Sequence, residues 1–481
     1  MTHHYLLEIG TEELPPGFMA SVPNELKQKV QDVLTDEGIG FEAVTVHITP
    51  RRIALEIKEL SETQESKDIL HKGPPIRIAF DDAGKPTKAA EAFANKLGVS
   101  VDSLKQDTSG KEPCLTYMES VSGKPVTEVL PKLLPDIVLS LSGPRFMRWG
   151  NGDDIRFARP IRWAVSLIDN TPLPVHFGSL QSGQTSRGHR FLCSEPVTIS
   201  SAQSYQNTLE ASGYVIVDAD RRKTMIREQL QKEAAHQGGE DPALLESNQE
   251  LFDTVAKIVE YPWVLCGSFA DDFLSLPPEV IITVMAAHQK YFPLETKDGK
   301  LLPKFLVVSN ARPEAVDTIR KGNERVLRAR LEDARYFFND DKNTALKDRL
   351  SMLKGITFQK GLGTMLDKTE RLKKLTETTA NILNYDAPII ADCVQAAELS
   401  KADLVTGMVF ELTELQGTMG RIYAQHEGYP TAVCQAIEDQ YAYQTDAIAQ
   451  WQTDNRTVSI ALSLADKMDT MIAVFCQPKA K

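Results

Sequence analysis

The sequence predicts a multidomain α+β protein, with mixed modules of helices and antiparallel strands followed by an all-α region. Its length of 481 residues suggests about three domains at roughly 150 residues each. Up to about residue 312, short apolar runs alternate with turn signals, whereas the rest follows almost only the helical period. The hydrophobic share of 42% is ordinary for a folded chain and excludes disorder as its main state.

We expect four segments along the chain. A small α+β unit occupies residues 1–60, and a mixed α+β body with an arginine-rich segment occupies residues 61–312. A basic connecting helix follows at 313–345, and an all-α domain occupies 346–481. The main boundary lies where strands and turns give way to the helical period.

The first unit has the pattern strand, helix, strand, strand. The apolar run 5–9 predicts the first strand, and apolar residues at helical spacing over 22–34 predict a helix that begins near Pro15-Pro16. Alternating runs at 44–48 and 53–57 flank a turn and predict a hairpin.

The body combines helices with short strands. Helices are predicted from apolar spacing, and strands from alternating runs between turns. The predicted helices lie at 88–97, 126–141, 219–237 and 243–259, with one more after Pro277-Pro278, and the short strands lie within 144–218 and 262–310.

Charge and hydropathy exclude several classes of protein. There are 54 Lys and Arg residues against 66 Asp and Glu, a formal charge of −12, which argues against a wholly basic nucleic-acid binder. A local basic face remains compatible with RNA binding. No apolar run approaches the ~20 residues that span a bilayer, so no membrane association is expected. The six cysteines include no CxxC pair, which favours reduced thiols and a cytoplasmic location.

Common catalytic and nucleotide-binding patterns are absent from the sequence. It contains no GxxxxGK[ST] loop, no GxGxxG fingerprint, no GxSxG elbow and no HExxH pair. The nine histidines are scattered. His189 and His288 lie beside basic residues, where each either contacts a phosphate or has a structural role. We therefore predict no catalytic residue and no metal ligand.

An arginine-rich segment spans residues 143–192. It holds seven arginines, no lysine and three aspartates, or +4 locally, and four aromatic rings are interleaved. Arginine pairs with phosphate through a planar fork, and aromatic rings can stack on unpaired bases. The alternatives are that the rings belong to the core and that the arginines meet carboxylates. The arginines are Arg145, Arg148, Arg156, Arg159, Arg162, Arg187 and Arg190, and the rings are Phe146, Trp149, Phe157 and Trp163.

A second basic cluster lies on the helix predicted at 314–338. At about 100° per residue one face is basic and the opposite face is apolar. The basic face holds Lys321, Arg325, Arg328 and Arg335, and the apolar face holds Ile319, Val326, Ala334 and Phe337. Arg330 falls within the apolar face, where it either pairs with Asp333 or contacts a substrate.

Several long runs together resemble the β subunit of bacterial heterotetrameric glycyl-tRNA synthetase. They extend from the first residues to about residue 475. The runs are Leu6-Leu7-Glu8-Ile9-Gly10-Thr11-Glu12-Glu13-Leu14-Pro15-Pro16, Thr49-Pro50-Arg51-Arg52-Ile53-Ala54, His288 to Pro293, Gly322 to Leu331, Leu415-Gln416-Gly417-Thr418-Met419-Gly420 and Ala465-Asp466-Lys467-Met468-Asp469.

The resemblance implies a noncatalytic role for this chain. In that family the α subunit of an α2β2 complex carries the class II site, so ATP and Mg²⁺ are expected there and no cofactor in this chain. The β subunit supplies most of the binding to tRNA(Gly). Family members continue to an anticodon-binding domain, so anticodon recognition is expected outside this sequence. The candidate tRNA contacts are Arg145, Arg148, Arg159, Arg162, Arg187, Arg190, Lys321, Arg325, Arg328 and Lys401.

The helical region resembles an HD-type domain whose metal ligands have been replaced. Ser400-Lys401 occupies the place of the His-Asp dyad, so a lysine supplies positive charge where a ligand would lie. This implies no metal and a surface for the tRNA arm that carries the amino acid. Two alternatives stay open, namely an HD-type metal-dependent phosphohydrolase and a noncatalytic assembly scaffold whose arginines meet acidic protein surfaces.

Overall fold

The computed structural model describes residues 2–81, 84–108, 113–143, 145–149, 155–239, 249–442, 450–451 and 453–476. It contains two compact units. The first is Met1–Met225 with Asp253–Pro262 and Asn310–Arg312, and the second is Ile226–Phe252 with Trp263–Ser309 and Pro313–Lys481. The boundaries of the four predicted segments stay predictions.

The first unit is built around a five-stranded antiparallel sheet in the order β10-β9-β1-β3-β2. The central strand β1 is buried from Tyr5 to Thr11, as a strand covered on both sides requires. The elements are β1 (Thr2–Thr11), α1 (Pro16–Asp36), β2 (Ala43–Thr49), β3 (Arg52–Ser61), α4 (Val126–Leu139), β9 (Ile161–Ile168), β10 (Thr171–Pro172) and α5 (Tyr205–Gly213).

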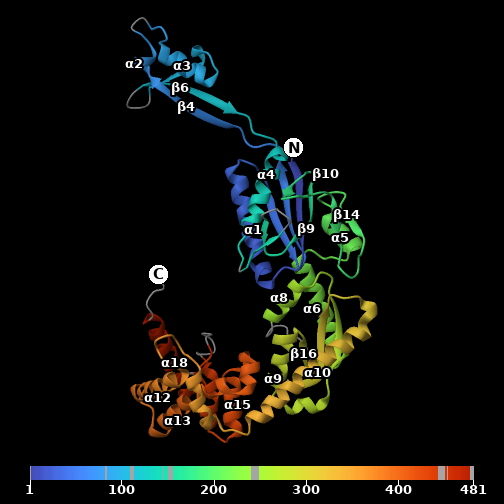
Figure 1. Ribbon diagram of the computed structural model, residues 1–481, viewed down its shortest axis with the longest axis vertical. Coiled ribbons are helices and arrows are strands. Elements are labelled where there is room, and N and C mark those ends of the chain that lie inside the picture. The colour runs from blue at the N-terminus through green and yellow to red at the C-terminus, as the bar shows by residue number, and fades with distance from the viewer. Residues whose placement is uncertain are drawn as a thin grey trace. The chain divides into compact units, whose positions relative to one another are not determined.

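Helices cover both faces of this sheet, α1 and α4 on one side and α5 on the other (Figure 1), and each face has its own core. Leu7 of β1 packs with Phe18 of α1 and with α4 on one face. Leu6 packs with Tyr205 of α5 on the other face. Because neighbouring strand residues point to opposite faces, the charged Glu8 of β1 shares the face of Leu6 and is fully buried there.

Smaller modules complete the first unit. A three-stranded sheet in the order β4-β6-β5 has a core of Ala79, Ala90 and Leu115. Its elements are β4 (Lys67–Pro75), α2 (Ile76–Ala79), α3 (Lys88–Leu97), β5 (Lys105–Asp107) and β6 (Cys114–Val121). The remaining strand pairs are β7 (Met147–Trp149) with β8 (Ile155–Phe157), β11 (His176–Phe177) with β12 (Leu180–Gln181) and β13 (Thr185–Arg187) with β14 (Pro196–Thr198).

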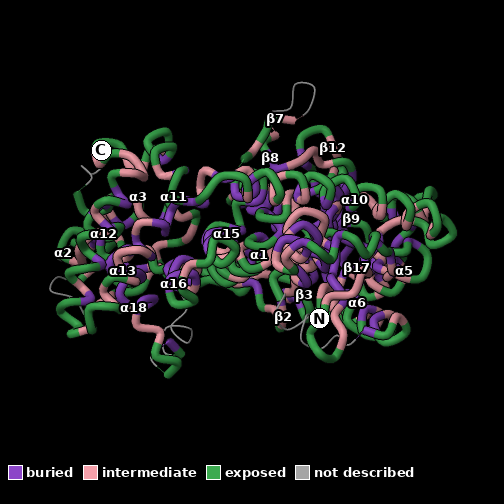
Figure 2. The backbone as a smooth tube through the Cα atoms, turned by 90° about the horizontal axis from the view of Figure 1, so that it is seen from below, coloured by how far each residue is buried: buried purple, intermediate pink, exposed green. Residues whose placement is uncertain are grey.

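The second unit joins a three-stranded antiparallel sheet, β15-β17-β16, to a helical bundle. One continuous core contains Phe305 of the sheet, Leu331 of α10 and Leu372 of α12. Figure 2 shows buried positions inside the strands and helices and exposed positions on the outer turns. The elements are β15 (Trp263–Ser268), α9 (Pro278–Thr283), β16 (Phe292–Glu295), β17 (Leu301–Ser309), α10 (Val316–Asp341), α11 (Leu346–Arg349), α12 (Met365–Ile382), α13 (Ala387–Leu399), α14 (Gly407–Glu411), α15 (Thr418–His426), α16 (Thr431–Asp439) and α18 (Thr457–Phe475). Helix α8 (Gln249–Ile258) is divided, with residues 249–252 in this unit and residues 253–258 in the first.

The predicted α+β class is confirmed, and so are most predicted elements. The helices at 88–97 and 126–141 are α3 and α4, and the hairpin is β2–β3. Helix α6 (Ala219–His236) matches the third prediction. The helix predicted at 243–259 is present as α8, and residues 243–248 lie outside the described part of the chain. The likeness to HD domains stays a prediction. Among the described residues, no helix is long and apolar enough to cross a membrane.

Arg222 of α6 is buried and satisfies four backbone carbonyls of the first unit. Its guanidinium donates to the oxygens of Ile216 at 2.6 Å, Val217 at 3.0 Å, Ile48 at 2.9 Å and Ala256 at 3.1 Å. Burial lowers the pKa of Arg222 to about 10, so the side chain remains charged near neutrality. This side chain therefore joins segments that lie far apart in the sequence.

Asp403 holds the turn before α15 in the second unit. Its Oδ2 accepts hydrogen bonds from the backbone nitrogens of Gly417 at 2.5 Å and Gly420 at 3.2 Å. Gly417 has φ +83°, which side chains disfavour, and a Cβ at Gly420 would lie 3.1 Å from Oδ2. Burial raises the pKa of Asp403 from 3.8 to about 6, against the effect of these donors.

We expect Arg222→Met to destabilise the first unit by about 3 kcal/mol or more, because four buried carbonyls lose their donor. Neighbouring Arg221 is the matched control, since it is exposed and pairs with Glu210 at 2.6 Å. Arg221→Met should cost about 1 kcal/mol or less. Urea unfolding combined with hydrogen exchange of β1 and β3 amides measures both variants. Equal losses would contradict the role of Arg222.

The pH dependence of stability provides a test of Asp403. The carboxyl titrates at 3.8 in the unfolded chain and at about 6 in the folded one, so folding favours its protonated form. Its stabilising contribution is complete below pH 3.8 and is lost as the pH rises through 6, by about 3 kcal/mol. Asp403→Asn keeps an acceptor without ionising, so this part of the pH dependence should vanish in urea titrations. A variant with the wild-type profile would show that Asp403 does not titrate in this range.

Candidate nucleic-acid interface

A buried charge cluster underlies the candidate interface in the first unit. Arg52, fully buried at the start of β3, lies 3.1 Å from Glu260 and 3.6 Å from Glu8. Burial works to lower the pKa of Arg52, but Glu260 and Glu8 together raise it. Thr49 donates to Glu260 at 2.6 Å and Ser186 donates to Glu8 at 2.6 Å. The cluster therefore links β1, β2, β3 and β13.

Trp163 of β9 covers this cluster. In the sheet register Gly10 lies between Arg52 and Trp163, and a Cβ at Gly10 would lie 1.8 Å from the indole ring. The missing side chain lets the ring lie across β1. The indole nitrogen donates to Glu8, which fixes the ring plane. The core interpretation of Trp163 is thus confirmed, but its surroundings are cationic.

Three guanidinium groups surround the Trp163 ring. Their central carbons lie 5.5 Å from the ring centroid for Arg51, 5.7 Å for Arg52 and 5.6 Å for Arg187. Arginine is attracted to the negative face of an aromatic ring at such distances. Arg52 is buried, whereas Arg51 and Arg187 line a pocket open to solvent. We call it the arginine pocket.

The arginine pocket has a volume of about 450 Å³. It lies where the β2–β3 turn meets the loop after β13. Its lining includes Arg51, Arg187, Gly188, Arg190, Cys193 and Glu195. Two of the predicted contacts, Arg187 and Arg190, are thus brought together, and Arg51 joins them from a distant part of the sequence.

The cations of the arginine pocket differ in their partners. Arg190 lies 3.2 Å from Glu13 and 3.6 Å from Glu12, and Arg162 lies 3.4 Å from Glu12. Among the described residues, Arg51 and Arg187 form no ion pair, and Nε of Arg51 is buried without a hydrogen-bond partner. Burial lowers the pKa of Arg51; Glu260 acts against this shift, and Arg52 and Arg190 add to it. An anion would relieve this repulsion.

His189 is structural, one of its two predicted roles. Its Nε2 lies 2.8 Å from Oδ1 of Asn310, and its Nδ1 accepts from the backbone nitrogens of Phe191 and Leu192. Burial lowers the pKa of His189, which favours the neutral ring that this acceptor role needs. The ring therefore fixes the loop that carries Arg187 and Arg190.

The other predicted arginines of this segment do not line the pocket. Arg145 and Arg148 are exposed at β7, and Arg159 donates to the carbonyl oxygen of Ala158 at 2.9 Å. Phe157 is fully buried, and Phe146 and Trp149 pack against the same core. These three rings are core residues, which confirms the second of the two interpretations, that the aromatic rings of this segment belong to the hydrophobic core.

Helix α10 in the second unit carries the other predicted basic face. Lys321, Arg325 and Arg328 are exposed, and among the described residues they form no ion pair. Arg335 is instead paired with Asp272 at 2.7 Å. Glu324 forms no ion pair with these cations among the described residues; its carboxylate accepts from the backbone nitrogen and the hydroxyl of Ser268.

The predicted apolar face of α10 was partly wrong. Leu327, Leu331 and Ala334 are buried, whereas Val326 is exposed. Arg330 is also exposed and pairs with Glu411 at 3.1 Å, so it is neither buried nor bonded to Asp333. The buried stripe lies to one side of the predicted one, where the sheet and α14 pack against the helix.

Lys401 requires a correction, because it is only 3% exposed. Its Nζ lies 3.4 Å from Asp466 and 4.4 Å from the ring centroid of Tyr441. Lys368 lies 2.9 Å from the same Asp466 oxygen. Burial lowers the pKa of Lys401, and Asp466 acts against this shift. Lys401 is an internal counter-ion of Asp466 and lies off any exposed RNA-binding surface.

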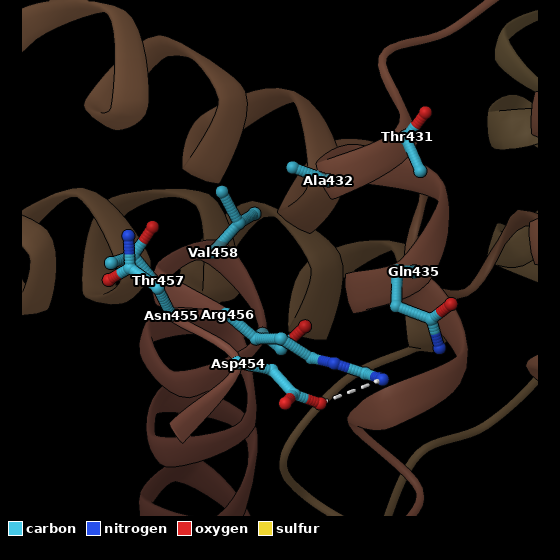
Figure 3. Close-up of a pocket in the computed structure, with 9 residues that line it drawn as sticks. Thr431, Ala432, Gln435, Asp454, Asn455, Arg456, Thr457 and Val458 are labelled. Atoms are coloured by element: carbon cyan, nitrogen blue, oxygen red, sulfur yellow. Dashed lines mark hydrogen bonds and ion pairs between the residues drawn. The ribbon is translucent and has the colours of Figure 1, made fainter. Parts of the chain in front are cut away.

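A second pocket, of about 330 Å³, lies at the first turns of α16 and α18 (Figure 3). Arg456 points across it and pairs with Asp439 at 3.2 Å and Asp454 at 3.5 Å. Its guanidinium is already neutralised, so we assign no ligand to this pocket. Within the described residues, no three His, Cys, Asp or Glu side chains are placed to hold a metal ion.

Sequence reasoning missed Arg51, although a signal was present. Thr49-Pro50-Arg51-Arg52 separates two alternating strands, so one arginine lies in the turn and the next begins β3. A period of two places adjacent residues on opposite sides, which predicts different environments for the two arginines. No local pattern in the sequence predicts that residues 187–190 lie beside this turn.

Known proteins resemble this chain over almost its whole length. A family model described as glycyl-tRNA synthetase beta subunit matches residues 5–480. The glycine–tRNA ligase beta subunit of Syntrophotalea carbinolica is 40% identical over 476 residues, which cover 99% of this chain and 67% of that protein. Proteins of the same name from Moorella thermoacetica and Geobacter sulfurreducens are 39% and 40% identical over 99% of this chain, covering 67% and 68% of theirs. The chain belongs to the glycyl-tRNA synthetase beta-subunit family.

Proposed function

We propose that this chain is the noncatalytic, tRNA-binding subunit of a cytoplasmic glycine–tRNA ligase. Its partner is an α subunit, in an α2β2 complex, whose class II site uses ATP and Mg²⁺ to attach glycine to tRNA(Gly). Family membership supports the ligase assignment. The sequence contains none of the common catalytic motifs that we searched for, which supports the assignment of catalysis to the α subunit and of tRNA binding to this chain.

The observation that carries the proposal is a group of solvent-accessible cations that have no carboxylate partner among the described residues. It includes the half-buried Arg51 and the exposed Arg187 in the arginine pocket, and the exposed Lys321, Arg325 and Arg328 on α10. Phosphate groups supply the dominant, salt-sensitive part of nucleic-acid affinity, and they meet such cations without displacing an existing ion pair. A chain of net charge −12 can therefore hold RNA locally.

The two alternatives gain less support from the structure. A phosphohydrolase would need a cation in the bundle, but Lys368 and Lys401 already neutralise Asp466 there. A pure scaffold would use its arginines on acidic protein surfaces. That alternative predicts assembly with the α subunit without tRNA binding, so the binding experiments below separate it from our proposal.

Helix α10 offers a charge-matched test of tRNA binding. We expect the triple variant Lys321→Gln, Arg325→Gln, Arg328→Gln to weaken tRNA(Gly) binding at least about tenfold, because unpaired cations meet phosphates directly. The slope of log affinity against log salt should fall by about one ion per lost contact. Fluorescence anisotropy over a salt series measures both quantities.

The control removes three other arginines from the same helix. Arg320, Arg330 and Arg335 each pair with a carboxylate, at 2.9 Å, 3.1 Å and 2.7 Å. Replacing these three with Gln changes the net charge equally but should lower the salt slope less. Equal effects of the two triples would mean that only overall charge matters and would remove α10 from the interface.

The division of labour has a separate test. Glycine-dependent exchange of pyrophosphate into ATP should be undetectable with this chain alone and should appear when the α subunit is added, because adenylate formation is assigned to that subunit. Co-purification checks that the two chains assemble. Exchange by the isolated chain, freed of contaminating synthetase, would overturn the noncatalytic role.

A further inference from the structure

The arginine pocket deepens the proposed RNA-binding function and rests on it. Two guanidinium groups, from Arg51 and Arg187, lie against one indole ring and line one concavity. They come from segments far apart in the sequence. The register of β3, β1 and β9 places the turn that carries Arg51 near Trp163, and Arg187 reaches the same ring from the end of β13. Their shared position suggests a shared ligand.

The surrounding charges favour an anion at this point. Glu12 and Glu13 are occupied by Arg162 and Arg190, and Glu8 and Glu260 are occupied by Arg52. Glu195 also lines the pocket, but no ion pair joins it to Arg51 or Arg187 among the described residues. The buried, unpartnered Nε of Arg51 is a donor that needs an acceptor.

We propose that Arg51 and Arg187 together bind one phosphate group of the RNA backbone in the arginine pocket. A phosphate presents enough acceptor oxygens for two guanidinium forks, and Trp163 keeps the two forks in place by contact with both. Arg190, already held by Glu12 and Glu13, contributes the rim of the pocket. This adds Arg51, which the sequence did not nominate, to the RNA-binding residues.

A double-mutant cycle tests whether the two arginines share one phosphate. Arg51→Gln and Arg187→Gln should each weaken tRNA(Gly) binding about tenfold. Because either change disrupts the same contact, the double variant should lose much less than the hundredfold that independent contacts would give. Each variant should lower the salt slope by about one ion. Arg221→Gln, an exposed arginine of the same unit with its own partner Glu210, should change neither quantity.

The outcomes separate the pocket from the proposed function. If the wild-type chain binds no tRNA, the RNA-binding function itself fails. If the wild type binds and the arginine variants bind equally well, only the pocket assignment is overturned. Multiplicative losses in the double variant would mean two separate contacts and would overturn the single phosphate. Variants that retain tRNA but lose the α subunit would assign the pocket to an acidic protein surface instead.

A footprint at Cys193 distinguishes RNA from smaller phosphate compounds. The thiol lines the pocket, whereas Cys476 is exposed elsewhere and serves as the internal control. Bound tRNA should slow alkylation of Cys193 by iodoacetamide but not of Cys476, as followed by peptide mass spectrometry. ATP and inorganic phosphate, tested at matched phosphate concentration, should leave both rates unchanged. Protection by ATP without protection by tRNA would overturn the assignment to the RNA backbone.

Discussion

The ion cluster of Arg52 with Glu8 and Glu260 is the constraint on which the first unit depends. A buried guanidinium loses several kcal/mol of hydration, so it persists only where carboxylates and hydrogen bonds replace the water. Here one cation meets two carboxylates, which in turn accept from Thr49, Ser186 and the indole of Trp163. These contacts fix several strands and turns relative to one another.

The same constraint shapes the surface above it. Glu8 fixes the plane of Trp163 through the indole nitrogen, and Gly10 leaves room for the ring to lie across β1. The ring then holds Arg51 and Arg187 at nearly equal distances. The buried cluster thus preorganises two cations that line a pocket open to solvent, which lowers the ordering cost of binding an anion.

Local patterns predicted the elements, but they could not predict the site. Helices α1, α3 and α4 and the β2–β3 hairpin follow from periods of 3.6 and 2 that are visible within a few residues. Glu8 and Ser186, by contrast, are 178 residues apart, and Arg52 and Glu260 are 208 apart. Only tertiary pairing reveals why a charge belongs in the apolar run of β1.

The errors on α10 and at Lys401 have the same origin. A helical period gives the width of an apolar stripe, but the packing partner decides which edge of that stripe is covered, and on α10 this left Val326 and Arg330 exposed. For Lys401 the partner was Asp466 on α18, and no local pattern connects the two residues. The sequence therefore predicted a covered position for Val326 and Arg330, which are exposed, and an exposed position for Lys401, which is buried.

Whether an arginine already has a carboxylate partner is a better guide to RNA contacts than the number of arginines in a segment. Arg162, Arg190, Arg330 and Arg335 were as prominent in the sequence as Arg187, yet each already has a carboxylate within 3.6 Å. An RNA phosphate must displace that carboxylate to bind them, and the exchange of one ion pair for another yields little net free energy. An unpaired guanidinium over an aromatic ring has no such competitor. In a chain with more acidic than basic groups, cations that the fold brings together and that have no carboxylate partner among the described residues are therefore best able to position a polyanion.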